Sequence, residues 1–437
     1  MTTSASIDPQ TLPTADTVSR YTLPSGAVLL VRRNPTTPSV IIHTVVRAGG
    51  VDEPPQRTGL ARFTAEMLAR GTETRSATQL WETAESLGAS FDVSSSKHTL
   101  QFSAKCLAED TYTLLTLLGD MQRIPTFPES EIERVRGETL TELDERMHST
   151  RYVASLAFNE LTFPATHPYS QPSMGTSESV SEISRNDLIA FYERTVPVRP
   201  MVTVVVGDVE PEAIRDFILR HWDESSGPRN GDIPRFPSIP SRTMSEVRHV
   251  VVDGKVQIDL ILGGIGPKRN DGDFFAASLA NVVLGGFGLM GRLGQSVREE
   301  RGLAYYATSR LTARFESGIW ECIAGVAPDH FDAAVDTIRA EITRLASEPV
   351  PEQEFADCKS SITGSLPLTL ESNEGIAAVM TDIELFDLGW DYLLRFPDRI
   401  AAVTREEVMD TTRRYLDPAT AVLASAGPAL SATERMI

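Results

Sequence analysis

Apolar residues follow two spacings along this chain, and the change from one to the other marks the predicted strands and helices. Residues 39–48 form an almost unbroken β-branched run, which predicts a strand buried on both faces. Residues 21–33 predict a hairpin, because a Pro-Ser-Gly turn separates two short apolar segments. Further strands are expected at 89–95, 98–106 and 201–208. Helices are expected around 62–69, at 77–87, 108–122, 184–195 and 274–284, and from the 124–132 segment to about residue 151.

The second half of the chain repeats the first in weaker form. Residues 349–355 echo 125–131, and residues 419–425 echo 201–206, each about 220 positions later. A Pro, Gly and Ser-rich stretch lies between the halves and has the composition of a linker. The sequence therefore predicts an α+β fold with two homologous domains. We expect a loosely held tail at 1–20, domains at 21–222 and 246–437, and a linker at 223–245.

Composition narrows the function classes. The net charge of −19 over 437 residues, without a long Lys/Arg run, argues against nucleic acid and anionic membranes as partners. No apolar run reaches the length of a membrane span, and the first ten residues lack the basic and apolar parts of a secretory signal. Three widely spaced cysteines are typical of a reducing compartment. A cytoplasmic location is the expectation.

The most informative stretch is Gly59-Leu-Ala-Arg-Phe-Thr-Ala-Glu-Met-Leu-Ala-Arg-Gly-Thr72. Arg62 and Glu66 are one helical turn apart, so they lie on one face of the predicted helix. The segment resembles the metal-binding helix of the pitrilysin/insulinase family of zinc peptidases, which reads Gly-Leu-Ala-His-Phe-x-Glu-His-Met-x-x-x-Gly-Thr. Arg62 stands at the first His of that motif, Ala65 at the catalytic Glu and Glu66 at the second His.

These three changes remove the chemistry of a zinc hydrolase. Such a site needs neutral imidazole or anionic ligands, an open position for water and a base that takes the water's proton. Arg62 offers no lone pair, and its positive charge repels a cation. Ala65 cannot accept a proton. We therefore expect no metal and no cofactor in this chain.

The resemblance also implies a third position, because the family carries its last zinc ligand in a phrase like Val-Leu-x-Glu-Ile. Residues 139–143 fit that phrase and place Glu142 there. We predict that the Arg62 guanidinium occupies roughly the space of the zinc and pairs with Glu66, Glu142 or both. The alternative is a solvated Arg62–Glu66 pair worth a few tenths of a kcal/mol. His43 and His167 are expected to be structural.

A second constellation lies at residues 284–305. Gly286, Gly288 and Gly291 mimic a dinucleotide fingerprint, but the preceding residues 274–284 predict a helix where that fingerprint requires a strand. A loop that turns sharply, or that approaches a peptide backbone closely, explains the glycines better. Gly286 and Gly288 are therefore candidates for substrate binding.

The same segment resembles the family phrase Ser-Arg-Leu-x-x-x-Leu-Arg-Glu-x-x-Gly-Leu-Ala-Tyr of the C-terminal domain. In the family, an Arg and a Tyr seven residues later hold the substrate carbonyl and support the developing oxyanion, and here these positions carry Arg298 and Tyr305. Both side chains donate hydrogen bonds to an oxygen that gains charge in the transition state. The alternative is that Arg298 pairs with a carboxylate such as Glu299 while Tyr305 begins a core strand.

Loss of the metal site with retention of the Arg/Tyr pair resembles one chain of the bacterial heterodimeric members, and the subunits of the mitochondrial processing peptidase. The resemblance implies two largely antiparallel, helix-packed sheets that form half of a clamshell chamber. It also implies a zinc-bearing sister subunit with an intact His-x-x-Glu-His motif, to which Arg298 and Tyr305 contribute, and peptide substrates.

Three other functions stay open. The first is a non-enzymatic scaffold or interaction protein of the same fold. The second is an autonomous metallopeptidase that uses Glu66, Glu142 and a displaced His. The third is a nucleotide-binding protein that uses the glycines at 286–291.

Overall fold

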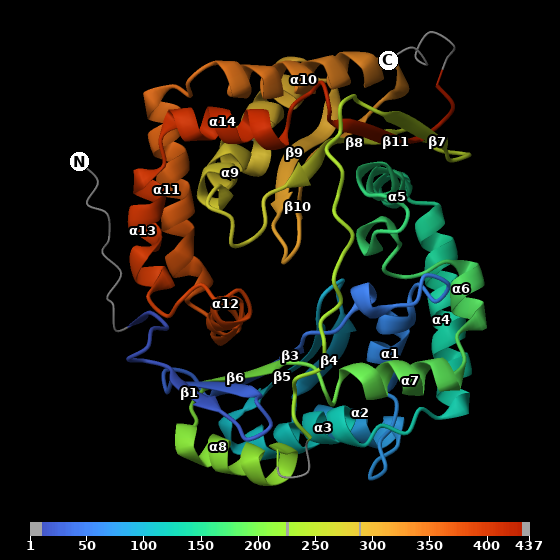
Figure 1. Cartoon of the computed structure of the whole chain (residues 1–437), viewed down its shortest axis with the longest axis vertical. Helices are drawn as coiled ribbons and strands as arrows, with labels where there is room; N and C mark the ends of the chain where they lie inside the picture. Colours follow the sequence, from blue (N-terminus) through green and yellow to red (C-terminus); the bar gives the residue numbers. More distant parts are fainter. Residues whose placement is uncertain (1–10, 224–226, 288–289, 431–437) are drawn as a thin grey trace. The chain divides into compact units, whose positions relative to one another are not determined.

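The computed structural model describes residues 11–223, 227–287 and 290–430, and the chain folds into two compact units (Figure 1). Unit 1 consists of residues 1–143, 172–235 and 366–395, and unit 2 consists of residues 144–171, 236–365 and 396–437. Each unit is built around its own mixed sheet. The expected α+β fold class is confirmed.

The sheet of unit 1 has six strands in the order β1-β2-β6-β3-β5-β4. Only the β2–β6 pair is parallel, and the other four pairs are antiparallel. Every residue of β6 is buried, and β3 lies between β6 and β5, as expected for strands with continuous apolar runs. The strands are β1 (Ser19–Thr22), β2 (Val28–Arg33), β3 (Ser39–Val46), β4 (Ser90–Ser95), β5 (Leu100–Leu107) and β6 (Met201–Gly207).

Helices cover both faces of this sheet. One face carries the largest apolar cluster, which includes Phe63 and Met67 of α1, while α12 packs on the other face through Ile376 and Met380. Ser184 caps α7 as expected, because its hydroxyl accepts from the backbone N–H of Asp187. The helices are α1 (Leu60–Leu68), α2 (Ala77–Ser86), α3 (Thr111–Arg123), α6 (Ser177–Glu182), α7 (Arg185–Thr195), α8 (Pro211–Ile218) and α12 (Asn373–Leu385).

The sheet of unit 2 has five strands in the order β7-β11-β8-β10-β9. Here β11 and β7 are parallel, and the remaining pairs are antiparallel. The strands are β7 (Val247–Val251), β8 (Ile258–Gly266), β9 (Ala304–Thr312), β10 (Gly318–Val326) and β11 (Val422–Gly427). The helices of this unit are α5 (Thr150–Thr162), α9 (Phe274–Asn281), α10 (Phe331–Ser347) and α14 (Arg405–Tyr415).

The two sheets have one topology. The order β2-β6-β3-β5-β4 matches β7-β11-β8-β10-β9 strand for strand, with the parallel pair in the same place. Thr404 caps α14 with the same reciprocal pattern that Ser184 forms at α7. The weak sequence repeat therefore corresponds to a repeated fold, in which β1 is the additional strand of the first copy.

The compact units do not coincide with the contiguous halves of the sequence. Residues 144–171, which include α5, pack in unit 2 against β8 and β11. Residues 366–395, which include α12, pack in unit 1 against β3 and β6. The ranges 21–222 and 246–437 therefore describe the two strand-bearing halves, whereas each compact unit takes a segment from the other half. The division falls inside α4 (Glu129–Met147), α11 (Glu352–Thr369) and α13 (Tyr392–Ala402).

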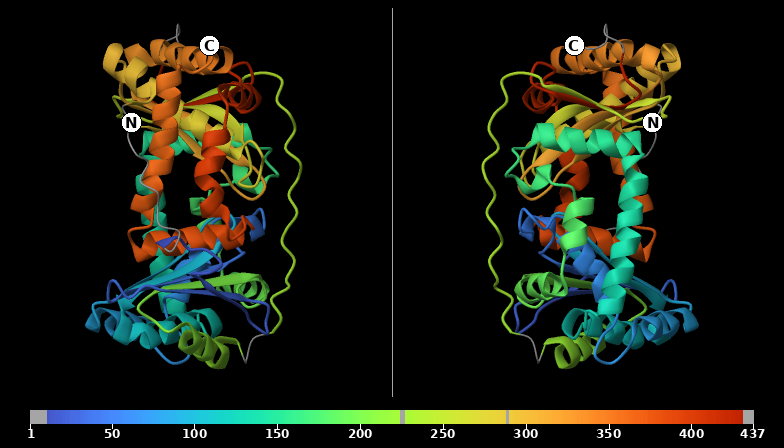
Figure 2. Two further views of the ribbon diagram at one scale, coloured as in Figure 1. Left: turned by 90° about the vertical axis from the view of Figure 1, so that its left-hand side faces the viewer. Right: turned by 90° about the vertical axis from the view of Figure 1, so that its right-hand side faces the viewer.

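The expected linker contains no regular structure over residues 227–243, which Figure 2 draws as a plain tube. The expected tail at 1–20 is too long, because Leu12 is buried against Ile383 and Leu393 and β1 begins at Ser19. Residues 1–10 lie outside the described part. The helix expected to run to about residue 151 ends at Met147, and Ser149 caps a new helix, α5.

Two further expectations concern the cysteines and membrane-spanning helices. All three cysteines are buried and unbonded to one another, as expected for apolar packing residues. Among the described residues, no helix combines the length and the apolar character that a bilayer crossing requires.

Candidate functional site

The candidate metal-site helix, α1, begins at a glycine because its backbone conformation demands one. Gly59 has φ of 88°, and a Cβ there would stand 2.6 Å from the carbonyl oxygen of Met174. Leu60, Phe63 and Met67 face the core of unit 1, so Arg62 and Glu66 fall on the partly exposed side of the helix. The helical spacing seen in the sequence thus places both charged groups on one face.

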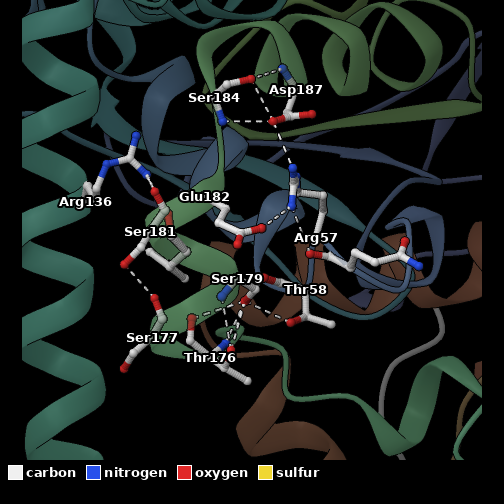
Figure 3. Close-up of polar contacts among 12 residues, drawn as sticks. Arg57, Thr58, Arg136, Thr176, Ser177, Ser179, Ser181, Glu182, Ser184 and Asp187 are labelled. Atoms are coloured by element: carbon white, nitrogen blue, oxygen red, sulfur yellow. Dashed lines mark hydrogen bonds and ion pairs between the residues drawn. The ribbon is translucent and has the colours of Figure 1, made fainter.

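Polar contacts hold the segment before α1 in place (Figure 3). The Thr58 hydroxyl donates to the Ser179 hydroxyl at 3.0 Å, and Ser179 in turn donates to the Thr58 carbonyl at 2.8 Å. Arg57 lies between Glu182, at 2.8 Å, and Asp187, at 3.5 Å. Because these partners belong to α6 and α7, the start of α1 is fixed to two other helices of unit 1.

The helix α4 carries Glu142, which stands at the third ligand position of the zinc motif. The Arg136 guanidinium lies 5.6 Å from the centre of the Phe63 ring and donates to the Val180 carbonyl at 2.5 Å. Arg70, just beyond α1, pairs with Glu138 at 3.2 Å. Glu142 stands one turn after Glu138 and therefore points to the same side of α4 as that carboxylate.

Arg62 pairs with both carboxylates, as predicted. Its Nε donates to Glu66 Oε1 at 2.9 Å, and its Nη2 donates to Glu142 Oε2 at 2.5 Å. Burial by itself would lower the pKa of Arg62, but the hydrogen bonds and charges of Glu66 and Glu142 raise it above the ordinary value. The guanidinium therefore stays protonated and bridges α1 and α4.

This arrangement does not fit a zinc ion. A permanent cation stands between the two carboxylates of the motif, Glu66 and Glu142, so a divalent ion would have to displace it. Ala65 is buried in the core and presents a methyl group where a hydrolase needs a base. In the described part of the chain, no cluster of three or more His, Cys, Asp or Glu side chains could hold a metal.

Glu53 is a site residue that the sequence did not single out. Its Oε1 accepts from the backbone N–H of Ala61 at 2.8 Å and so satisfies a free donor in the first turn of α1. Burial raises the pKa of Glu53 to about 7, although the Ala61 N–H and the charge of Lys97 oppose the rise. The only signal in the sequence is an acidic residue shortly before an N-terminus without a polar cap.

The second constellation lies in unit 2. Arg298 belongs to a wide, π-type turn, η8 (Gly294–Glu300), and Tyr305 is the second residue of β9. The guanidinium lies 5.9 Å from the centre of the Tyr305 ring, and its Nε is 3.5 Å from Glu299 Oε1. Tyr305 lies at the start of a strand that contributes Ala304 and Ala307 to the core of unit 2, although its own side chain is 80% exposed. The contact with Glu299 is present, whereas the role of the Arg/Tyr pair stays a prediction.

The glycine-rich segment follows α9, so a helix and not a strand precedes it. A further π-type turn, η6 (Val282–Gly286), ends at Gly286, where a Cβ would meet the Asn281 side chain at 2.7 Å. A Cβ at Gly285 would stand 2.6 Å from the backbone nitrogen of Ser309 in β9. Close backbone packing thus explains these glycines, and Gly288 lies outside the described residues. Substrate binding by Gly286 stays a prediction.

Two histidines have structural surroundings. His43 Nδ1 is 3.1 Å from the Thr381 hydroxyl within unit 1. His167 accepts from the backbone N–H of Tyr169 at 3.1 Å and stacks on Phe163. Unit 2 also contains a cavity of about 570 Å³, lined in part by His167 and residues 236–242. Its lining residues include neither the 286–291 glycines nor Arg298 and Tyr305.

Comparison with known proteins identifies the family. Residues 28–176 match "Insulinase (Peptidase family M16)", and residues 182–362 match "Peptidase M16 inactive domain". An uncharacterized zinc protease of Bacillus subtilis is 26% identical over 81% of this chain and 85% of its own length. The chain belongs to peptidase family M16, the insulinase or pitrilysin family.

Solved structures share the fold. A peptidase M16 inactive domain from Pseudomonas fluorescens superposes with a TM-score of 0.87 at 24% identity, over 95% of this chain and 99% of that one. A protease from Helicobacter pylori superposes with a TM-score of 0.88 at 18% identity, over 94% and 99%. The inactive-domain match does not include α1, so it gives no information on residues 62, 65 and 66, which stand at the zinc-motif positions.

The Arg62 bridge predicts a charge-dependent loss of stability. Arg62→Met keeps most of the side-chain length but leaves Glu66 and Glu142 without their shared cation. We expect a loss of about 1 kcal/mol in the free energy of unfolding at pH 8, since all three groups are partly exposed. The loss should shrink in about 1 M salt, because added ions screen the repulsion between two partly exposed carboxylates. Urea unfolding at low and high salt measures it, with Arg62→Lys as the charge-keeping control. A Met variant as stable as wild type at pH 8 contradicts the bridge.

Glu53 predicts a pH trend. Because folding raises the pKa of this acid, the folded state disfavours the carboxylate, and its contribution to stability falls as pH rises from about 4.5 to about 7. Glu53→Gln should therefore stabilise the chain at pH 8, by about 1 to 3 kcal/mol, and have little effect near pH 4.5. Thermal unfolding across this range checks the trend against the exposed control Glu82→Gln. A difference that does not vary with pH rules out the assigned cause.

Proposed function

We propose that this chain is the non-catalytic subunit of a heterodimeric zinc peptidase. By this proposal a sister chain with an intact His-x-x-Glu-His motif binds the zinc, and this chain contributes Arg298 and Tyr305 to the partner's site. The observation that carries the proposal is an asymmetry. The metal position of unit 1 is filled by a paired cation, whereas the Arg/Tyr pair of unit 2 keeps donors that reach solvent.

The chemistry of the pair supports this role. Peptide hydrolysis passes through a tetrahedral intermediate whose oxygen carries negative charge, and fixed donors stabilise that charge. A phenol and a guanidinium both donate hydrogen bonds, and the guanidinium adds a permanent positive charge. Tyr305 is 80% exposed, and the contact between Arg298 and Glu299, at 3.5 Å, is loose. Neither donor is committed to a tight, buried partner, so both can serve an oxygen on another molecule.

The scaffold is the second candidate, and one observation favours it. Arg298 already has a carboxylate neighbour in its own turn, Glu299, as expected for a surface pair without a catalytic task. The two candidates differ in what the loss of one donor does. A scaffold tolerates Arg298→Ala and Tyr305→Phe, whereas a subunit that supports the transition state does not.

The proposal predicts activity only in the assembly. The purified chain should cleave no peptide, and mixing it with its zinc-bearing sister chain should produce hydrolysis of a fluorogenic peptide. Tyr305→Phe and Arg298→Ala should each lower that rate by about 10²- to 10³-fold, the usual scale for the loss of one transition-state donor. Tyr112→Phe, at a half-exposed tyrosine of α3, is the matched control and should have no effect.

Co-elution in size-exclusion chromatography shows whether each variant still assembles. Assemblies that contain Tyr305→Phe and Arg298→Ala with wild-type rates exclude the catalytic role and favour the scaffold. Hydrolysis by the isolated wild-type chain contradicts the proposal altogether.

A further inference from the structure

Tyr305 sits at an irregularity of the second sheet. In the pairing of β9 with β10, Tyr306 lies opposite Gly325, and the next pair joins Ala304 to Val326. Tyr305 therefore has no partner residue, and two residues of β9 oppose one of β10. This is a β-bulge, a feature that re-aims a side chain and often accompanies functional sites.

The bulge changes the face on which Tyr305 lies. In a regular strand, residues two apart share a face, so Tyr305 would point into the core with Ala307 and Ser309. Instead Ala304 and Ala307, three positions apart, both belong to the core cluster of unit 2. The extra residue between these core positions is displaced outward, which explains why Tyr305 is exposed.

Three paired residues lie side by side on neighbouring strands next to the bulge. Asp259 of β8 pairs with Gly325 of β10, and Gly325 pairs with Tyr306 of β9. A Cβ at Gly325 would stand 2.5 Å from Cε1 of Tyr306 and 2.5 Å from Nε2 of Gln257. The Tyr306 ring therefore lies across the glycine, in space that any larger residue would fill. It reaches over β10 to the strand beyond.

The far end of the Tyr306 ring is fixed by a buried acid. Its hydroxyl donates to Asp259 Oδ1, and the Thr150 hydroxyl, from the start of α5, donates to Asp259 Oδ2. The Arg151 guanidinium lies 5.2 Å from the centre of the Tyr306 ring. Burial, together with the hydrogen bond to Asp259, raises the pKa of Tyr306, so its proton stays in place. Three elements, β8, β10 and α5, thus hold one side chain of β9.

We propose that Tyr306, Gly325 and Asp259 are positioning residues, which hold the bulge of β9 and thereby present the Tyr305 phenol outward. Because Ala304 and Ala307 both face the core, the two tyrosines between them leave the strand on the opposite face, and a fixed Tyr306 limits where its neighbour Tyr305 can point. The catalytic part of this inference rests on the proposed function, because it assigns Tyr305 a target. The structural part concerns this chain alone. Donors that are already fixed need no reorganisation during the reaction, so restraint of the Tyr305 phenol would favour catalysis.

The first test uses the isolated full chain labelled with 3-fluorotyrosine. Its ¹⁹F spectrum contains one signal for each of the nine tyrosines, and the signals of Tyr305 and Tyr306 are assigned from Tyr305→Phe and Tyr306→Phe. Gly325→Ala should move the Tyr306 signal, because the new methyl group displaces the ring. We expect the Tyr305 signal to move or broaden as well. Gly264→Ala in β8 is the matched control, since a Cβ there meets only the Tyr415 carbonyl oxygen at 3.8 Å.

The second test measures peptide hydrolysis by the assembly with the zinc-bearing sister chain. Gly325→Ala should lower kcat by about 10- to 100-fold, on the scale of a 1 Å misplacement, and leave KM nearly unchanged. In a Tyr305→Phe background the same substitution should cause little further loss, since both changes remove one interaction. Tyr306→Phe, which keeps the ring over Gly325 but loses the contact with Asp259, should have a smaller effect and covers the case in which Gly325→Ala does not fold.

The outcomes separate the two proposals. A Tyr306 signal that moves while the Tyr305 signal does not overturns the positioning role, whatever the activity shows. Losses of kcat that add fully in the double variant overturn it too, because the two residues then act independently. If Tyr305→Phe itself leaves the rate of the assembly unchanged, the proposed function fails. A moved Tyr305 signal then still supports the structural role of the bulge.

Discussion

The bridge from the Arg62 guanidinium to Glu66 and Glu142 decides what unit 1 can do. Two helices bring their carboxylates to one place, and this geometry requires a positive charge there. In the zinc peptidases that the α1 segment resembles, the charge at this place is a metal ion. In this chain it is a side chain, which holds the helices together but cannot polarise water or accept a ligand. The backbone arrangement of a metal site can therefore be kept while the residues that bind the metal are replaced.

The Arg298/Tyr305 pair lies in unit 2, and the position of Tyr305 has a different physical basis. Tyr305 is exposed not because its strand is polar but because a bulge shifts the alternation of β9. The bulge coincides with a glycine that makes room for the Tyr306 ring and with a buried acid that receives its hydroxyl. An exposed phenol next to a ring that buried contacts hold is unexpected for a solvated surface residue. It agrees with a donor whose position matters, as the proposed role in a heterodimeric peptidase requires.

The sequence predicted most of this fold from local patterns, and its errors have identifiable causes. The apolar runs at 39–48 and 201–208 became central strands, and Ser184 became an N-cap, because these features depend on neighbouring residues. The exchange of α5 and α12 between the two halves could not be predicted from the sequence, because the apolar face of a helix does not indicate which of two sheets it will pack against. For the same reason Leu12 was assigned to a loose tail, although its partners lie more than 370 positions away. The Arg62 bridge followed from motif positions, whereas Glu53 and the bulge at Tyr305 depend on burial and strand register, which single-residue patterns do not contain.

The metal content of the purified chain tests the central claim most directly. The wild-type chain, prepared without chelators, should contain no stoichiometric zinc by mass spectrometry of the metals. A rebuilt chain with Arg62→His, Ala65→Glu and Glu66→His, and with Glu142 kept, should hold about one zinc ion, since it restores three ligands and a base. Tightly held zinc in the wild-type chain, together with cleavage of peptides by that chain alone, would contradict the account.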